Sequence, residues 1–348
     1  MSDFKINSIA TKQGQHGPVI AGVSTVNSTG CMKIPSGPTE FRGGRGRGII
    51  AGGRNHPVAY NVIELIEIAT AGNTTDFGDL ASENTGGGGG NSSSTRAFIC
   101  GGYDPSPGDQ LTTMQFITLS SQGGANEFGD LRSKNTAHGG GSNNTRGLLY
   151  GGNDPNYIAD IFQFNLQSLG TETDFGSVFE NEPIRNTVIV TSPTRAVFGG
   201  GQISAGNTNT IAFREIASGG IVSKFGELTY AANGHTSADS STRGLYVGGI
   251  SGPATVTNMD FITIASEGNA QDFGNLTQNR KNISPNSNSI RATFAGGTSL
   301  ASGTGTNFNV IDFVTIATTG NAQDFGDLSA VKRVANMGGS DSHGGIGL

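Results

Sequence analysis

The sequence predicts an all-β fold, a β-propeller of six four-stranded blades, and three observations support this prediction. Glycine accounts for 57 of the 348 residues without a Gly-X-Y period, proline accounts for only 11, and tryptophan is absent. Apolar residues gather in short β-branched and aromatic runs, such as VIDFVTIA from Val310 to Ala317. Two sequence landmarks return about every 50 residues. Many short strands joined by glycine turns, repeated at such a period, are typical of propeller blades.

The first landmark is an arginine followed by an apolar run that closes on a glycine pair, as in GIIAGG ending at Gly53. The arginines that begin these runs are Arg47, Arg96, Arg146, Arg195, Arg243 and Arg291. We expect each run to be a strand whose arginine is held by an acid or a backbone carbonyl of its own or the next blade. The alternative is a cationic ring that attracts anions.

The second landmark is a Phe-Gly box. The nonapeptide GNAQDFGNL at Gly268 to Leu276 returns as GNAQDFGDL at Gly320 to Leu328. The phenylalanines of the six boxes are Phe77, Phe128, Phe175, Phe225, Phe273 and Phe325. Asp-Phe-Gly also binds magnesium in protein kinases, but one box has Lys224 before its phenylalanine, and a metal site could not accept a lysine there. We therefore predict that the phenylalanine fills the gap between blades and the glycine turns the chain.

Within each unit a variable loop follows the glycine pair, then a longer apolar strand, a turn, the box and a short polar stretch. In the fifth unit the longer strand is expected from Met259 to Ser266. The tail from Val334 to Leu348 matches the stretch that elsewhere precedes and begins the arginine-led strand, with His343 at the arginine position. We expect this tail to complete the first blade and close the ring, which removes exposed strand edges.

This order of strand, glycine pair, loop, second strand and aromatic anchor resembles a kelch repeat, with phenylalanine where kelch repeats usually have tryptophan. More specifically, TIATTGNAQDFGDL followed by an arginine-led strand resembles repeats in structural proteins of tailed bacteriophages, notably marine and cyanobacterial phages. The resemblance covers the chain from about Gly46 to its end, and Ser36 to Gly48 resembles the lead-in of such proteins. It implies a virion protein that is made in the host cytoplasm.

Residues 1–45 stand outside the six-fold period. They contain PVIAGVSTV at Pro18 to Val26, which suits a strand, and are too few to bury a good core alone. We expect residues 1–45 to be a docking arm that binds other virion proteins, with packing on its own propeller as the alternative. Residues 46–348 are then the propeller.

Charge and motif content argue against several classes of protein. A net charge of −6 gives no broad basic surface for nucleic acid, and no 18-residue apolar run predicts insertion into a membrane. The five histidines lack metal-ligand spacing, and Cys31 and Cys100 are too few for a disulfide framework. We therefore expect a non-enzymatic protein without catalytic residues, metal or cofactor.

The leading functional expectation is thus a virion structural protein, attached to the tail, a fibre or the capsid through its arm. The alternative is a propeller that binds a host-surface glycan or another receptor through the loops after each glycine pair, because these loops differ most among the blades. Sugars favour aromatic platforms, and the candidate residues in these loops are Tyr60, Tyr103 and Tyr157.

Overall fold

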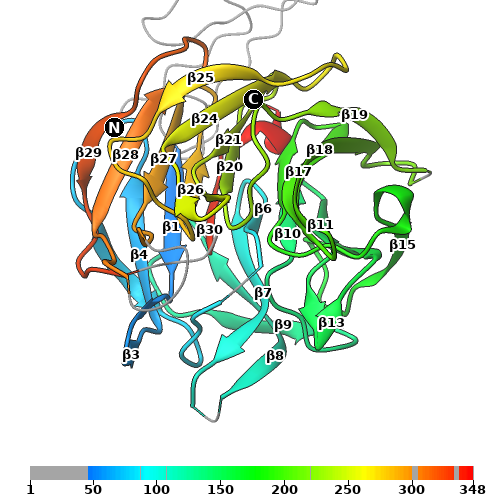
Figure 1. Ribbon diagram of the computed structural model, residues 1–348. Coiled ribbons are helices and arrows are strands. Elements are labelled where there is room, and N and C mark those ends of the chain that lie inside the picture. The colour runs from blue at the N-terminus through cyan, green and yellow to red at the C-terminus, as the bar shows by residue number, and fades with distance from the viewer. Residues whose placement is uncertain are drawn as a thin grey trace, which may run out of the picture. The chain divides into compact units, whose positions relative to one another are not determined.

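The computed structural model describes residues 46–347, except 87, 107, 220, 300–304 and 333–336. It confirms an all-β propeller with six four-stranded antiparallel sheets arranged in a ring (Figure 1). The expected docking arm, residues 1–45, lies outside the described residues, and so do His16 and Cys31. We number the blades by chain order of their second strands.

The blades share one order of strands from the axis outward. Their sheets are β30-β1-β4-β5 in blade 1, β6-β7-β8-β9 in blade 2, β10-β11-β14-β15 in blade 3, β16-β17-β18-β19 in blade 4, β20-β21-β24-β25 in blade 5 and β26-β27-β28-β29 in blade 6. The innermost strands are β30 (Gly338–Ser340), β6 (Asn91–Ser92), β10 (Gly139–Ser142), β16 (Val188–Thr191), β20 (Thr236–Asp239) and β26 (Ser284–Ser287). The second strands begin at the repeat arginines: β1 (Arg47–Ala51), β7 (Arg96–Asp104), β11 (Arg146–Tyr150), β17 (Arg195–Ile203), β21 (Arg243–Val247) and β27 (Arg291–Ala295).

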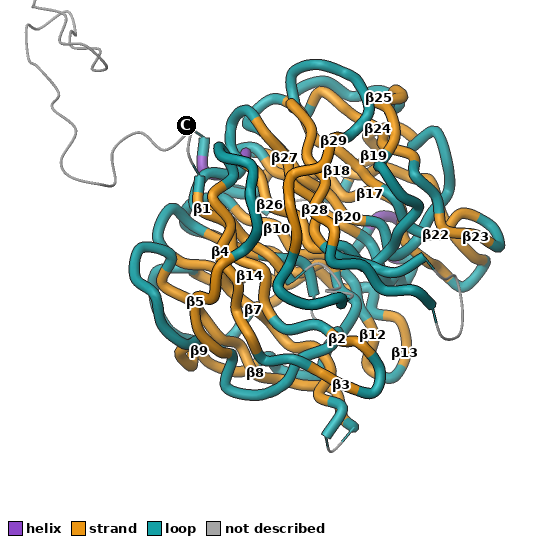
Figure 2. Tube along the Cα trace, turned by 90° about the vertical axis from the view of Figure 1, so that its left-hand side faces the viewer, coloured by secondary structure: helices purple, strands orange, loops and turns teal. Residues whose placement is uncertain are grey.

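The two outer positions carry the longer strands and the Phe-Gly boxes. The third strands are β4 (Val62–Glu67), β8 (Asp109–Thr118), β14 (Asp160–Asn165), β18 (Gly206–Glu215), β24 (Asn258–Thr263) and β28 (Val310–Thr315). The outermost strands are β5 (Thr75–Asp79), β9 (Asn126–Asp130), β15 (Thr173–Ser177), β19 (Ser223–Glu227), β25 (Gln271–Asn275) and β29 (Gln323–Asp327). Two-residue strands form the hairpins β2 (Arg54–Asn55) with β3 (Val58–Ala59), β12 (Asn153–Asp154) with β13 (Asn156–Tyr157), and β22 (Ile250–Ser251) with β23 (Ala254–Thr255). Figure 2 shows these hairpins on the side of the propeller away from the C-terminal end.

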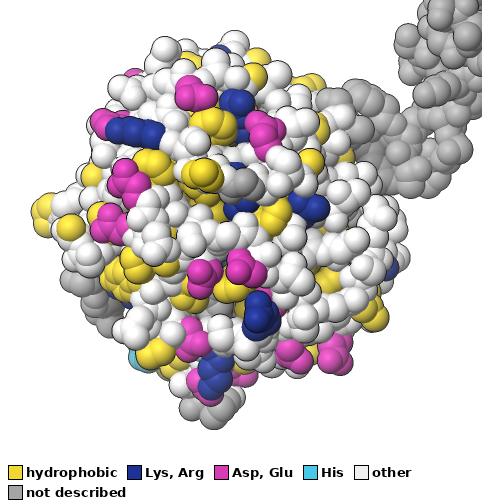
Figure 3. All heavy atoms as spheres, turned by 90° about the vertical axis from the view of Figure 1, so that its right-hand side faces the viewer, with side chains coloured by type: hydrophobic (Ala, Val, Ile, Leu, Met, Phe, Trp, Pro, Cys, Tyr) yellow, Lys and Arg dark blue, Asp and Glu magenta, His cyan; other side chains and the backbone are white. Residues whose placement is uncertain are grey.

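Burial explains why the second strands are apolar throughout. After its arginine, each short second strand is buried on both faces, as in β1 and β27, because neighbouring blades pack on either side. An outermost strand such as β25 is exposed except around its phenylalanine. The apolar clusters cross blade boundaries: Phe77 of blade 1 and Ile117 of blade 2 belong to the same cluster. The core therefore lies between the blades. On the side shown in Figure 3, side chains of both charge signs are scattered among apolar and polar groups.

The chain closes the ring at its C-terminal end. The innermost strands contact one another in an unbroken circle, and β30 pairs with β1 in the register Gly48↔Ser340 and Ile50↔Gly338. The turn that joins these two strands in other blades is replaced by contacts between the two chain ends: the Arg47 N–H donates to Asp341 Oδ1 at 2.9 Å, and the Asp341 N–H donates to the Arg47 carbonyl at 3.0 Å.

The expected position of His343 is wrong. Arg47 itself occupies the arginine position of blade 1, since it follows the split turn as Arg146 follows its own turn in blade 3. The chain continues past Asp341 toward the axis, where His343 caps the short 3-10 helix η2 (Gly344–Ile346).

Candidate functional site

The six repeat arginines connect neighbouring blades. Each guanidinium donates to a main-chain carbonyl in the turn after the third strand of the next blade. The acceptors are Leu119 for Arg47, Leu166 for Arg96, Ile216 for Arg146, Ile264 for Arg195, Ile316 for Arg243 and Ala69 for Arg291. Most of these guanidiniums also lie over a phenylalanine ring, as Arg243 does over Phe261 at 4.3 Å from the ring centre. Their charges face carbonyl oxygens and aromatic rings, and two of them, Arg47 and Arg195, also pair with glutamates.

The Phe-Gly boxes form a second set of contacts between blades. Five of the six phenylalanines are at most 4% exposed, and Phe175 is half-buried. The carbonyl of Phe225 accepts from Gly268 of the next blade at 2.9 Å, and that of Phe273 accepts from Gly320 at 2.7 Å. A Cβ on Gly274 would lie 2.4 Å from the Gly320 carbonyl oxygen.

The repeated nonapeptide therefore contacts the preceding blade through its first glycine and the following blade through its Phe-Gly pair. The acids that precede its phenylalanines, Asp272 and Asp324, are exposed on the outermost strands. The close repetition is explained by these contacts, because both ends of the segment must fit a neighbour.

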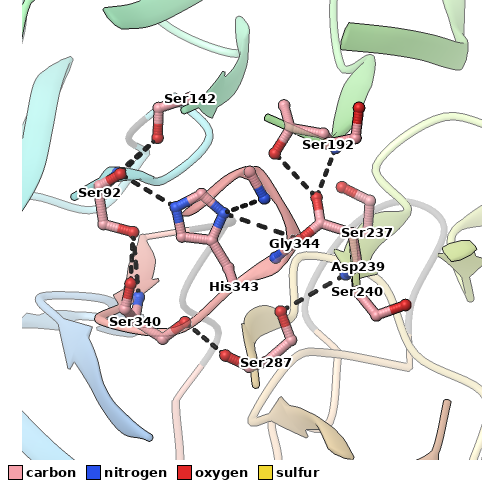
Figure 4. A network of polar contacts seen from close by, with 12 residues as sticks. Ser92, Ser142, Ser192, Ser237, Asp239, Ser240, Ser287, Ser340, His343 and Gly344 are labelled. Carbon is pink, nitrogen blue, oxygen red and sulfur yellow. Dashed lines mark hydrogen bonds and ion pairs between the residues drawn. The ribbon is translucent and has the colours of Figure 1, made fainter. Parts of the chain in front are cut away.

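A ring of polar side chains surrounds the axis where the innermost strands end (Figure 4). Its members hold the same register position in all six blades: Ser92, Ser142, Thr191, Asp239, Ser287 and Ser340. They bond around the ring: the Ser92 hydroxyl donates to the Ser340 carbonyl at 2.9 Å, the Ser340 hydroxyl donates to the Ser287 carbonyl at 2.6 Å, and the Thr191 N–H donates to the Asp239 carboxylate at 2.5 Å. A cavity of about 60 Å³ lies beside the ring.

His343 and η2 cover this ring. The His343 ring lies between Ser92 and Asp239, with Nε2 at 3.0 Å from the Ser92 carbonyl and Nδ1 at 3.8 Å from Asp239 Oδ1 (Figure 4). The Gly345 N–H donates to Nδ1 at 3.2 Å, so Nδ1 is the acceptor and Nε2 carries the proton. Burial raises the pKa of Asp239, and the N–H groups of Thr191 and Gly344 that donate to its carboxylate oppose this rise. Since both ring nitrogens bond main-chain groups, His343 holds the C-terminal segment in place.

Of the other described histidines, two are buried and one is exposed, and the described cysteine is buried. His138 and His235 occupy equivalent places at the start of inner strands, and burial lowers the pKa of each to about 4. His56 is exposed beside Arg54. Burial raises the pKa of the Cys100 thiol. Between residues 46 and 347, apart from the undescribed positions, no group of three or more His, Cys, Asp or Glu side chains is placed to hold a metal ion, and no helix is long and apolar enough to cross a membrane.

The three candidate tyrosines are only partly accessible. The guanidinium of Arg185 lies over the Tyr157 ring at 4.5 Å, and the ammonium of Lys332 lies 5.5 Å from the centre of the Tyr60 ring. Tyr103 is half-buried on β7. The three belong to three different blades, 1, 2 and 3.

The axial ring was missed by sequence reasoning, although a signal for it exists. Five of its members stand four residues before a repeat arginine, where the sequence has Ser, Ser, Thr, Asp and Ser. This position was not distinguished because it lies in a stretch rich in serine, threonine and asparagine throughout.

No protein-family model matches the chain, and a search of curated proteins finds no match either.

Proposed function

We propose that the protein is a non-enzymatic structural component of a bacteriophage virion, a closed propeller attached to the tail, a fibre or the capsid through residues 1–45. A structural rather than enzymatic role is supported by the contacts that the repeated side chains make. The arginines, the phenylalanine boxes and the axial hydroxyls all bond or pack against neighbouring blades. Such use suits a rigid scaffold. The virion setting is supported by the resemblance of the repeats to those of phage structural proteins.

Mass spectrometry of purified particles tests the virion setting. We expect peptides of this chain at a fixed ratio to the major capsid protein. Complete, infectious particles that lack the chain would refute the proposal. A chain without Met1 to Arg45 should be missing from otherwise normal particles, and its incorporation at the usual ratio would move the attachment surface to the blades.

A receptor- or glycan-binding propeller is the second candidate, and the hairpins between second and third strands favour it. In blades 2 and 4 the second and third strands stay paired up to the turn that joins them. In blades 1, 3 and 5 the connection between these strands contains a separate hairpin of two-residue strands. Variation of this kind on a rigid scaffold is where recognition usually resides. A glycan array separates the candidates, because a purely architectural protein binds no sugar on it.

A further inference from the structure

The six junctions between blades follow one plan. In each, the linker from an outermost strand to the next innermost strand contains a residue whose carbonyl accepts the N–H of the second glycine of the pair, at 2.8 to 3.1 Å. We call this the linker position. It is held by Asn84, Asn135, Ile184, Ala232, Arg280 and Lys332 in chain order. Each junction also contains a third-strand residue of the following blade, the one that pairs with the residue before the box phenylalanine. In the order of the linker positions above, these third-strand residues are Gln115, Phe162, Ala212, Asp260, Asp312 and Glu64.

Two junctions fill the space between these positions with a basic side chain and a carboxylate. Arg280 pairs with Asp312 at 2.8 Å and donates to the Gly296 carbonyl at 2.7 Å, and neither charged side chain is exposed. Lys332 pairs with Glu64, and both side chains are 1% exposed. In these junctions a cation on a flexible stem occupies the space between blades.

The junction between blades 3 and 4 lacks both polar partners. Its linker position is Ile184 and its third-strand position is Ala212, and a cavity of about 90 Å³ remains there. Tyr150 and Phe198, whose rings stack at 4.0 Å, line it together with these two residues. The cavity is smaller than the roughly 150 Å³ that holds a benzene molecule. It therefore suits the end of one side chain and is too small for a sugar ring.

Between its box phenylalanine and its linker position, this junction has two more residues than each of the others, and this stretch adds two carboxylates. The extra residues form the 3-10 helix η1 (Phe179–Asn181), in which Glu180 and Asn181 both have φ of 54°. Left-handed conformations at two successive non-glycine residues cost about 1 kcal/mol or more each. Glu180 and Glu182 line the cavity. Among the residues that the structure describes, neither carboxylate has a hydrogen bond or a salt bridge. The ammonium of Lys224 pairs with Glu227 at 2.8 Å, and Glu180 adds only a smaller charge effect that raises the pKa of this lysine.

We propose that this cavity binds a basic side chain, lysine or arginine, of a partner polypeptide. The aromatic and aliphatic wall receives the alkyl stem, and Glu180 and Glu182 face the cation, which can also lie against the Tyr150 ring. The bound side chain takes the place that Arg280 and Lys332 take in their own junctions. This site is on the propeller itself and is independent of the virion assignment.

The test is a titration of the full-length protein with a glycine-flanked lysine peptide, its arginine counterpart and its norleucine analogue. Binding is followed through the methyl NMR signals of Ile184 and Ile203, which line the cavity. We expect both cationic peptides to shift these signals and the norleucine peptide to bind about tenfold more weakly or not at all, since it lacks the charge. The Glu180→Gln/Glu182→Gln variant should bind the cationic peptides about three- to tenfold more weakly.

Two further variants sharpen the result. Glu83→Gln removes one carboxylate from the exposed linker after blade 1 and should leave binding unchanged. Ile184→Lys/Ala212→Glu copies the pair Lys332 and Glu64, fills the cavity from within, and should abolish binding while the protein remains folded. Equal binding of the norleucine peptide, no loss in the Glu180→Gln/Glu182→Gln variant, or no shift of the cavity signals by either cationic peptide would each overturn the proposal.

Discussion

The guanidinium of Arg280 lies 2.8 Å from the carboxylate of Asp312, and both side chains are completely buried between blades 5 and 6. Asp312 also accepts from the N–H and the hydroxyl of Thr277, at 3.0 and 2.7 Å. Between blades 1 and 2 the same two positions hold Asn84 and Gln115, and Gln115 accepts the N–H of Ala81 at 2.9 Å. Equivalent junctions are thus filled by a charged pair, Arg280 and Asp312, in one case and by a neutral pair, Asn84 and Gln115, in the other.

This relationship predicts strong coupling between the two residues. Asp312→Gln alone leaves a buried guanidinium without its counter-charge and should cost about 3–5 kcal/mol in the free energy of unfolding. Adding Arg280→Asn copies the junction of blades 1 and 2 and should recover a large part of that loss. Urea denaturation of both single variants and the double variant measures this. If the two losses simply add, the pair is not coupled and the equivalence of the junctions is wrong.

The buried histidines predict a loss of stability in mild acid. Burial lowers the pKa of His138 and His235 from 6.5 to about 4, so below pH 6.5 the unfolded chain binds protons that the folded protein rejects. Their contribution is complete above pH 6.5 and falls as the pH drops toward 4, by up to about 3 kcal/mol each.

The free energy of unfolding should therefore decline between about pH 7 and pH 5, before most carboxylates titrate. Replacing both histidines with threonine, the residue found at the equivalent Thr187, should flatten that decline even if it lowers stability overall. An unchanged pH slope in the double variant would mean that other groups cause it.

The sequence predicts those features of this molecule that recur from one repeat unit to the next. The blades and the C-terminal strand of blade 1 follow from landmarks that recur along the chain. The third strand of blade 5, expected from Met259 to Ser266, ends at Thr263, because the buried Ile264 belongs to the turn whose carbonyl accepts from Arg195. Periodicity of apolar residues does not separate a buried strand from a buried turn.

The junction residues were not predicted because the partners are far apart in the sequence, 32 residues for Arg280 and Asp312 and 268 for Glu64 and Lys332. Asp312 and Arg280 become partners only when the neighbouring blades pack against each other. The cavity beside Ile184 is likewise visible only by comparison with the other junctions. The place of His343 could not be predicted either, since nothing in the tail marks where it leaves the strand for the axis.

Close packing at the axis predicts one sensitive glycine. A Cβ on Gly90 would lie 1.5 Å from the Gly338 carbonyl oxygen, where the inner strands of blades 1 and 2 meet. Gly90→Ala should therefore destabilise the protein by about 1–3 kcal/mol or more. Gly72→Ala is the matched control, because a Cβ there has no neighbour within 4 Å, and its effect should stay within about 0.5 kcal/mol. Equal effects of the two substitutions, measured by thermal unfolding, would contradict this packing.

Six mutually supporting blades form a ring that β30 closes. Thermal unfolding together with size-exclusion chromatography tests this closure on a chain that lacks Met337 to Leu348, compared with one that lacks only Ser342 to Leu348. The longer deletion removes β30 and exposes the edge of β1, so we expect a much lower melting temperature and aggregation. The shorter one keeps β30 and Asp341 and should lose far less stability. A monomeric product of the longer deletion with an unchanged melting temperature would mean that β30 does not close the ring.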